Sequence, residues 1–373
     1  MPGIPFGPTG LGTTAAQLPS LLATGRPSRD APYEPGLGPV RGASVYVERT
    51  WGDGSHSPLY CPSPERIDEV LADVVDARLV SWARDQGCEE HELEALGKAR
   101  FGSLVTLAHP DTDDPDPLLV AAQLNASWWA ADDYYADDTA LGAVPTLLPQ
   151  RLTLAMAAMD PVPPVGDLTP PLQEALQNDL VLRMFDSSVA HLTCHATPAQ
   201  VQRICYSTFA MFVSWTAYAA WRETREYPPA WEYLAARQHD SFYTSMTLID
   251  VVGGYELPAN LFYEPRVRRA AMQAGTASVI VNDLHSVAKD AADENPVCNL
   301  VLLIAADRDC PVEEATEIAV GLHNDLVRGF ETTHRELATV SSPELQRFLR
   351  GLRAWMGGGF EWHATNPRYA EQT

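Results

Sequence analysis

The sequence predicts an all-α protein built around one large helical domain. Apolar residues recur at helical spacing over long segments, and helix-capping patterns precede several of them. No series of short alternating strands separated by turn residues is found. The chain has 373 residues, and 46% of them are hydrophobic, so it can bury a substantial core. We therefore expect a single domain of roughly ten helices.

The predicted elements follow one another from residue 61 onward. Residues 1–60 are rich in Pro and Gly and are expected to form a disordered arm, whereas residues 61–373 form the domain. Ser63 and Pro64 resemble an N-cap followed by proline, which predicts that the first helix starts there. Gly357–Gly359 are expected to form a flexible hinge before the terminal segment. Further helices are predicted over residues 118–135, 172–195, 198–226, 231–252, 265–292, 312–334 and 343–356.

Charge and cysteine usage exclude several classes of function. The formal net charge is −23, so the chain lacks the basic surface needed to bind nucleic acid or an anionic membrane. The six cysteines show neither CxxC nor Cys/His zinc spacing, which indicates reduced thiols and a cytoplasmic location. Neither a signal peptide nor an apolar stretch long enough to span a bilayer is visible.

The most informative segment is residues 282–290, NDLHSVAKD. It places Asn282, Ser286 and Asp290 at i, i+4 and i+8, so their oxygen-bearing side chains share one face of a helix. Three oxygen donors in a row suit Mg²⁺, which keeps several waters that an anionic substrate can replace. Lys289 lies beside them as a point charge for a phosphate.

A second acidic cluster, DDYYADD at residues 132–138, lies about 150 residues upstream, at the end of an apolar helix. Carboxylates at a helix C-terminus meet the unfavourable end of the helix dipole and repel one another. A bound cation would compensate for this cost. The two segments therefore suggest two walls of one site that holds a diphosphate through magnesium.

Both segments resemble motifs of the class I terpene synthases. DDYYADD is similar to their aspartate-rich motif, and NDLHSVAKD to their second metal motif, NDxxSxxxE. Arg237 lies 45 residues before Asn282, where the family has an arginine that senses the diphosphate. Arg368 and Tyr369 resemble the family's terminal Arg-Tyr pair. The resemblance extends from residue 132 to residue 369 and implies an α-helical bundle that surrounds a central active-site cavity.

Within this family the DDYYxDD form and the Pro/Gly-rich arm resemble the bacterial enzymes that cyclise a C-methylated geranyl diphosphate, the 2-methylisoborneol and 2-methylenebornane synthase group. One departure concerns Asp290, because the family motif ends in Glu. Aspartate retains a carboxylate but is shorter by one methylene. We expect Asp290 to remain a ligand, and Glu294, one turn further on, is the alternative.

The resemblance also implies a role for each site residue. Asp132 would bind two Mg²⁺ ions with support from Asp133 and Asp137, and Asn282, Ser286 and Asp290 would bind the third. Asp240 and Ser241 would help to trigger ionisation together with Arg237. The diphosphate oxygens would be held by Arg237, Lys289, Arg368 and Tyr369. An apolar, aromatic pocket would stabilise the carbocation, and Phe212 and Trp362 are the preferred wall residues.

The implied activity is Mg²⁺-dependent ionisation and cyclisation of 2-methylgeranyl diphosphate. Water capture would give 2-methylisoborneol, and proton loss would give 2-methylenebornane. A sesquiterpene cyclase acting on farnesyl diphosphate is an alternative, because it would share every metal and diphosphate residue. A chain-elongating prenyl transferase fits less well, since it usually repeats DDxxD. A non-catalytic scaffold is disfavoured by the intact Arg237, Lys289 and Arg-Tyr pair. A small-molecule diphosphate is the expected partner, and a homodimer is compatible with the sequence.

His191 and His195 form an HxxxH pair on a predicted helix. Such a pair can bind zinc, but neither HExxH nor a third ligand accompanies it in the sequence. We therefore interpret the pair as structural.

Overall fold

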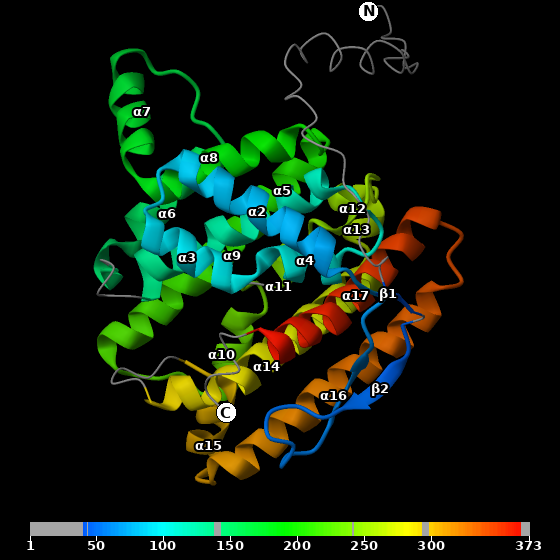
Figure 1. Ribbon diagram of the computed structural model, residues 1–373. Coiled ribbons are helices and arrows are strands. Elements are labelled where there is room, and N and C mark those ends of the chain that lie inside the picture. The colour runs from blue at the N-terminus through cyan, green and yellow to red at the C-terminus, as the bar shows by residue number, and fades with distance from the viewer. Residues whose placement is uncertain (1–39, 43, 138–142, 241, 293–297, 367–373) are drawn as a thin grey trace, which may run out of the picture. The chain divides into compact units, whose positions relative to one another are not determined.

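The computed structural model describes residues 40–42, 44–137, 143–240, 242–292 and 298–366 (Figure 1). Most of the predicted arm, Ser241, Glu294, Arg368 and Tyr369 lie outside these residues. The helices are α2 (Glu69–Gln86), α3 (Glu90–Ala99), α4 (Phe101–Ala108), α5 (Pro115–Ala131), α6 (Leu148–Met159), α7 (Thr169–Asn178), α8 (Leu180–Thr193), α9 (Pro198–Thr224), α10 (Ala230–Arg237), α11 (Phe242–Met246), α12 (Ile249–Val252), α13 (Ala259–Phe262), α14 (Pro265–Ala292), α15 (Leu300–Arg308), α16 (Val312–Leu337) and α17 (Pro343–Thr365). A π-helical segment η1 (Asp132–Asp137) and the 3-10 turns η2 (Pro145–Leu147) and η3 (Gly166–Leu168) complete the helical structure. The predicted all-α class is confirmed.

Two small antiparallel sheets precede the helices. These sheets were not predicted from the sequence. Strand β1 (Val40–Arg41) pairs with β4 (Arg66–Ile67), and β2 (Tyr46–Arg49) pairs with β3 (Leu59–Pro62). β3 packs on α16 and α17, and Leu59 is fully buried. The boundary predicted at residue 60 therefore falls inside a hairpin that belongs to the folded domain.

The first helix begins later than predicted. Arg66 lies in β4, fully buried, and its guanidinium donates to the Thr106 and His109 carbonyl oxygens at 2.9 and 3.1 Å. These bonds hold the segment after Ser63 extended across the end of α4. The helix instead starts after Asp68, whose carboxylate accepts from the Leu71 amide at 3.0 Å as an N-cap.

Two predicted helices are interrupted at polar residues. The segment 172–195 divides at Asp179, which caps α8 and accepts from the Tyr135 hydroxyl at 2.6 Å. Because the Asp179 carboxylate caps the start of α8 and binds Tyr135, α7 ends before this residue and α8 begins after it. The segment 231–252 divides into α10, α11 and α12. In contrast, α14 has the predicted bounds of residues 265 and 292.

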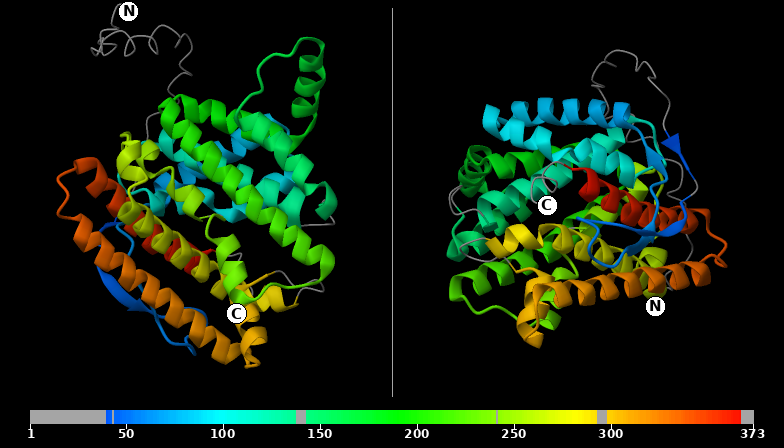
Figure 2. Two further views of the ribbon diagram at one scale, coloured as in Figure 1. Left: turned by 180° about the vertical axis from the view of Figure 1, so that it is seen from behind. Right: turned by 60° about the horizontal axis from the view of Figure 1, so that its bottom comes forward.

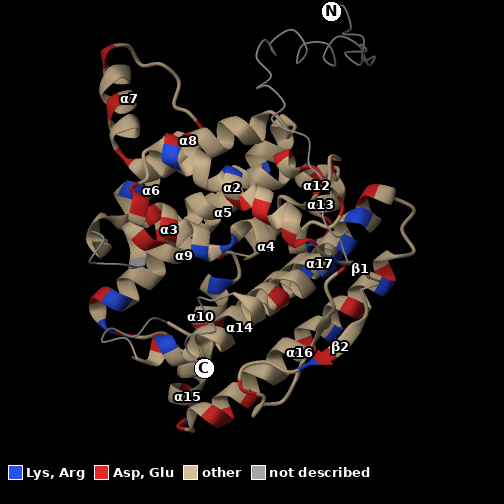
Figure 3. Ribbon diagram, viewed as in Figure 1, with Lys and Arg blue, Asp and Glu red and all other residues tan. Residues whose placement is uncertain are grey.

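Helix α14 lies alongside α16 and α17, while α5 packs against α2, α4 and α8 (Figures 1 and 2). The glycine triplet expected to be a hinge lies inside α17. A Cβ on Gly358 would lie 2.8 Å from the backbone of Leu107, so this glycine allows α17 to approach α4 closely. Asp and Glu occur along many helices, including α7 and α16 (Figure 3). Among the described helices, none combines the length and apolar character needed to cross a membrane.

Candidate active site

A cavity of about 240 Å³ lies where α4, α5, α9, α10, α11, α14 and α17 meet. It brings together Asp132, Arg237, Asp240, Asn282 and Trp362, which the sequence predicted as site residues at widely separated positions. The complete lining is Phe101, Leu104, Asn125, Trp128, Trp129, Asp132, Met211, Trp215, Arg237, Asp240, Phe242, Ser245, Asn282 and Trp362. Polar groups for a diphosphate and rings for a hydrocarbon therefore face one space.

The first wall is the end of α5. The chain passes into the π-helical turn η1 at Asp132, and such turns, which are rare in proteins, frequently occur at functional sites. Asp132 faces the main cavity, whereas Asp133 lines a neighbouring cavity with Tyr134, whose hydroxyl donates to Glu92. The two adjacent aspartates of the motif thus line two neighbouring cavities. Asp137 ends the segment, and its side chain lies outside the described structure.

The second wall is α14. Asn282 lines the cavity. Ser286 lies one turn and Asp290 two turns further along the helix, and the Ser286 hydroxyl donates to the Asp290 carboxylate at 2.6 Å. Asn299, the N-cap of α15, donates its side-chain N–H to the same carboxylate at 2.8 Å. The shorter Asp290 therefore still reaches its neighbour in the row. The donors along this face are all oxygens, as Mg²⁺ requires, so the set fits the predicted ion.

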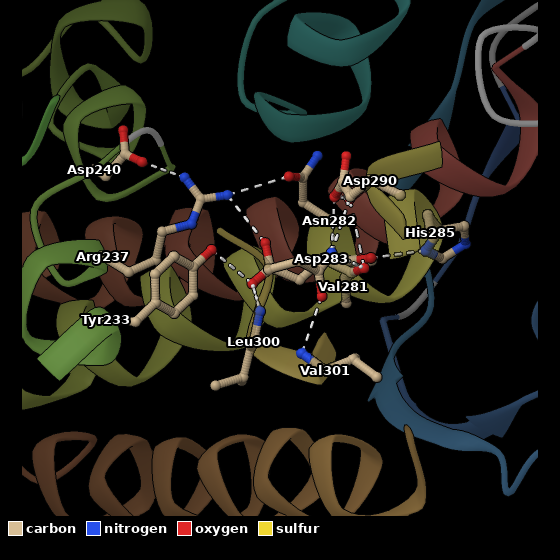
Figure 4. Close-up of polar contacts among 12 residues, drawn as sticks. Tyr233, Arg237, Asp240, Val281, Asn282, Asp283, His285, Asp290, Leu300 and Val301 are labelled. Carbon is tan, nitrogen blue, oxygen red and sulfur yellow. Dashed lines mark hydrogen bonds and ion pairs between the residues drawn. The ribbon is translucent and has the colours of Figure 1, made fainter. Parts of the chain in front are cut away.

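Arg237 at the end of α10 joins the walls of the cavity (Figure 4). Its guanidinium donates to Asp240, to Asn282 Oδ1 at 3.2 Å and to Asp283 Oδ1 at 3.1 Å. Burial alone would lower the pKa of Arg237, but Tyr233, Asp240 and Asp283 raise it well above its ordinary value. The guanidinium therefore stays charged in the cavity. Asp240 is fixed in turn by the Trp215 indole N–H at 2.9 Å.

Asp283 lies within the second metal motif, and its Oδ1 meets the same Arg237 nitrogen as Asn282 Oδ1. It is buried, and its Oδ2 accepts from the Tyr233 hydroxyl at 2.8 Å and from the Leu300 amide at 3.1 Å (Figure 4). These bonds connect α14 to α10 and α15. Asp283 thus positions Arg237 against Asn282, a role that sequence reasoning missed. An acidic residue among apolar neighbours was the available signal.

His363 on α17 was also missed. Its Nδ1–H donates to the Gly359 carbonyl oxygen at 2.7 Å, so its Nε2 accepts from the Asn282 amide N–H at 3.2 Å. Burial lowers the pKa of His363 to about 3, which keeps the ring neutral and able to accept this bond. The side-chain amide of Asn282 is thereby oriented with its nitrogen toward His363 and its oxygen toward Arg237. No sequence motif marks such a contact.

Aromatic residues form much of the remaining lining. Trp362 lines the cavity as predicted, and its indole N–H donates to the Arg100 carbonyl oxygen at 3.1 Å. Phe212 is not among the lining residues, contrary to prediction. It packs against Phe185 and Trp215, with ring centroids 6.0 and 5.3 Å away. Helical geometry explains the difference, because Met211 and Trp215 occupy the face of α9 that meets the cavity.

One predicted diphosphate ligand lies away from the polar contacts described above. Lys289 is exposed in the last turn of α14, beside Asp290. Arg368, Tyr369 and Ser241 lie outside the described residues.

Comparisons with known proteins agree with this geometry. Residues 123–329 match the family model "Terpene synthase family 2, C-terminal metal binding". The chain is 36% identical to a 2-methylisoborneol synthase from Streptomyces ambofaciens, over 98% of this chain and 80% of that protein. It is 31% identical to another from Saccharopolyspora erythraea, over 89% of this chain and 94% of that protein.

A solved structure gives the same result. The 2-methylisoborneol synthase from Streptomyces coelicolor, in complex with Mg²⁺ and 2-fluoroneryl diphosphate, matches with a TM-score of 0.80 and 35% identity. The match covers 83% of this chain and 96% of that chain. The chain therefore belongs to the terpene synthase family and is a class I terpene cyclase.

Proposed function

We propose that the protein converts 2-methylgeranyl diphosphate into 2-methylisoborneol with release of diphosphate. One observation carries the proposal: a single cavity contains Asp132, Arg237 and Asn282 together with the indole rings of Trp128 and Trp362. Such a cavity can receive a diphosphate at charged groups and the attached hydrocarbon at aromatic faces. The relatives named 2-methylisoborneol synthase support this choice among terpene cyclisations.

The polar groups of the cavity would act on the leaving group. Arg237 would donate to diphosphate oxygens, since its pKa keeps it charged and its fork of N–H groups suits phosphate. Asp132 would hold two Mg²⁺ ions with support from Asp133 and Asp137, and Asn282, Ser286 and Asp290 would hold the third. These ions would neutralise the negative charge on the departing diphosphate. We propose that Lys289, Arg368 and Tyr369 complete the diphosphate contacts, and that Asp240 and Ser241 assist Arg237.

The apolar groups would act on the cation. When the C–O bond breaks, its electron pair leaves with the diphosphate and an allylic cation remains. Ring faces stabilise a cation through their quadrupole without bonding to it. The indole N–H groups of Trp128 and Trp215 are bound to Thr208 and Asp240 at 3.1 and 2.9 Å, so these rings are held in place.

Formation of an alcohol requires one water beside the final cation. Asn125 and Ser245 line the cavity, and the Ser245 hydroxyl donates to Asn125 Oδ1 at 2.8 Å. A hydroxyl oxygen whose proton is committed to a neighbour can still accept a bond from water. We propose that this pair holds the water whose oxygen bonds to the cation and whose proton then passes to the released diphosphate. Without the water, proton loss from the cation would give 2-methylenebornane.

Product analysis tests the proposed function. Purified protein with Mg²⁺ is incubated separately with geranyl, 2-methylgeranyl and farnesyl diphosphates, and volatile products are identified by gas chromatography–mass spectrometry. We expect 2-methylisoborneol from the methylated substrate, and loss of turnover in Asp132→Asn but not in Asp186→Asn, a matched change at an exposed carboxylate on α8. A farnesyl-derived product alone would support the sesquiterpene reaction, and no product from any substrate would refute cyclisation.

Two further points remain proposals. We propose a cytoplasmic location, supported by the six free cysteines, and fractionation that finds the protein outside the cytoplasm would refute it. We also propose a homodimer, which light scattering coupled to size-exclusion chromatography would test, and a monomeric mass would exclude.

A further inference from the structure

A cluster outside the active site has the chemistry of a transition-metal site. Asp116 in the first turn of α5 lies beside His191 in the last turn of α8 and His195 in the turn that follows. One ligand atom from each of the three lies within 4.8 Å of the others, and within the described residues they form a possible metal-binding group. The sequence lacked a third ligand for the HxxxH pair, and the packing of α5 on α8 supplies it.

Two of the separations between ligand atoms are close to those that a small metal ion needs. His195 Nε2 lies 3.3 Å from Asp116 Oδ2, and His191 Nε2 lies 3.8 Å from Asp116 Oδ1. Ligands of a tetrahedral Zn²⁺ at about 2.0–2.1 Å are separated by about 3.3 Å. The imidazole rings of His191 and His195, with centroids 5.2 Å apart, approach Asp116 with the same nitrogen. Only small movements would therefore bring all three atoms onto one ion.

The protein orients one ligand in the way that metal sites usually do. Nδ1 of His191 lies 2.7 Å from the buried side-chain oxygen of Gln123, so this nitrogen carries the proton. Nε2 is then left with its lone pair toward Asp116. A metal-bound histidine typically donates its other N–H to an oxygen in this manner.

The surroundings leave room for a cation and for water. The side chains of His191 and His195 are about one-quarter exposed, and that of Asp116 is half exposed. Arg78 is the nearby basic group, and its Nη1 lies 3.9 Å from Asp116 Oδ1, beyond hydrogen-bonding distance. Asp116 is thus weakly paired with Arg78 and keeps its second oxygen for His195.

We propose that Asp116, His191 and His195 form a second metal site, separate from the magnesium site and selective for Zn²⁺-type ions. Two imidazoles and one carboxylate, with an open position for water, form a ligand set that suits Zn²⁺ better than Mg²⁺. A bound ion would connect the C-terminal end of α8 to the N-terminal end of α5, the helix that leads to Asp132. Its expected effect is to stabilise the native fold.

Calorimetric titration of Zn²⁺ into the full-length protein tests this site. A large excess of Mg²⁺ occupies the oxygen ligands of the active site, and Cys194→Ser is used as the background because this exposed thiol lies next to His195. We expect one Zn²⁺ per chain. Removal of a ligand in His195→Ala or Asp116→Asn should weaken binding by at least about tenfold. His91→Ala, a matched change at an exposed histidine on α3, should leave the affinity unchanged.

Thermal unfolding gives a second measurement that is independent of catalysis. Zn²⁺ should raise the unfolding temperature of the parent protein and of His91→Ala, and raise it less in the two ligand variants, because an ion that binds only the folded state stabilises it. Equal Zn²⁺ affinity in the parent, His195→Ala and Asp116→Asn would overturn the proposal, as would no binding to the parent. Neither result bears on the cyclase activity.

Discussion

Replacing His363 with phenylalanine should weaken the active site through Asn282. Phenylalanine fills nearly the same space but cannot accept the 3.2 Å bond from the Asn282 amide. A neutral hydrogen bond of this kind contributes about 0.5–1.5 kcal/mol, which corresponds to a loss of about 2- to 13-fold in kcat/KM. The Mg²⁺ concentration for half-maximal rate should rise by a similar factor, since the oxygen of Asn282 is the proposed ligand.

His323→Phe is the control for this change. His323 is also buried and neutral, and its Nδ1 lies 3.0 Å from the Asn324 side-chain oxygen on α16, away from the cavity. Both variants should lose stability of the same order, but only His363→Phe should alter kcat/KM and the Mg²⁺ dependence. Product formation is measured across a Mg²⁺ titration, with circular dichroism to confirm folding. A folded His363→Phe with wild-type values for both would refute the orienting role.

Four other predictions have defined outcomes. Asp290→Ala should lower kcat/KM by about 100-fold or more, while Asp290→Glu should remain active; unchanged turnover in the alanine variant would remove this residue from the ligand set. Ser245→Ala should shift the product from alcohol toward alkene by gas chromatography, and a constant ratio would exclude its hydroxyl from holding the water. Gly102→Ala should lower the free energy of unfolding in urea by about 1–3 kcal/mol, because its Cβ would lie 2.3 Å from a backbone oxygen of α2. Gly97→Ala, which meets nothing within 4 Å, should instead raise it by about 0.5–1 kcal/mol, and equal effects would contradict the packing argument. Burial raises the pKa of the Asp76 carboxyl to about 6. The protonated carboxyl therefore contributes to the stability of the fold at pH values below the unfolded-state pKa, and this contribution is lost as the pH rises through 6. The stability of the wild type relative to Asp76→Asn should therefore fall by up to about 3 kcal/mol between about pH 4 and pH 7, and a constant difference would refute the shift.

The parts of the fold that the sequence predicted well are those in which local and tertiary preferences agree. Helix α14 begins at a proline and keeps an apolar face throughout, so periodicity alone located both ends. The oxygen donors on its other face were visible for the same reason. The spacing of Asn282, Ser286 and Asp290 depends on helix geometry and on nothing distant in the chain.

The errors occur where a long-range contact decides the local structure. Arg66 is held in an extended strand by carbonyl oxygens some 40 residues away, and its hydrogen bonds outweigh the capping pattern at Ser63. Phe212 was assigned to the wrong face of α9, because all sides of that helix carry aromatic residues and the sequence does not show which side meets the cavity. His363 and Asp116 could not be recognised, since their partners lie on other helices.

Asp290 shows how such contacts alter the meaning of a motif. From the sequence we expected Asp290 to remain a ligand, although a carboxylate one methylene shorter reaches less far from α14. In the fold it accepts bonds from Ser286 on its own helix and from Asn299 at the start of α15. Asn299 is fully buried and uses its oxygen to cap α15, so the position of its N–H group is fixed by a neighbouring helix. Both bonds end on Asp290 Oδ2, so they fix the orientation of the carboxylate before an ion binds. The residue that departs from the family pattern is therefore also one that a second helix holds in place.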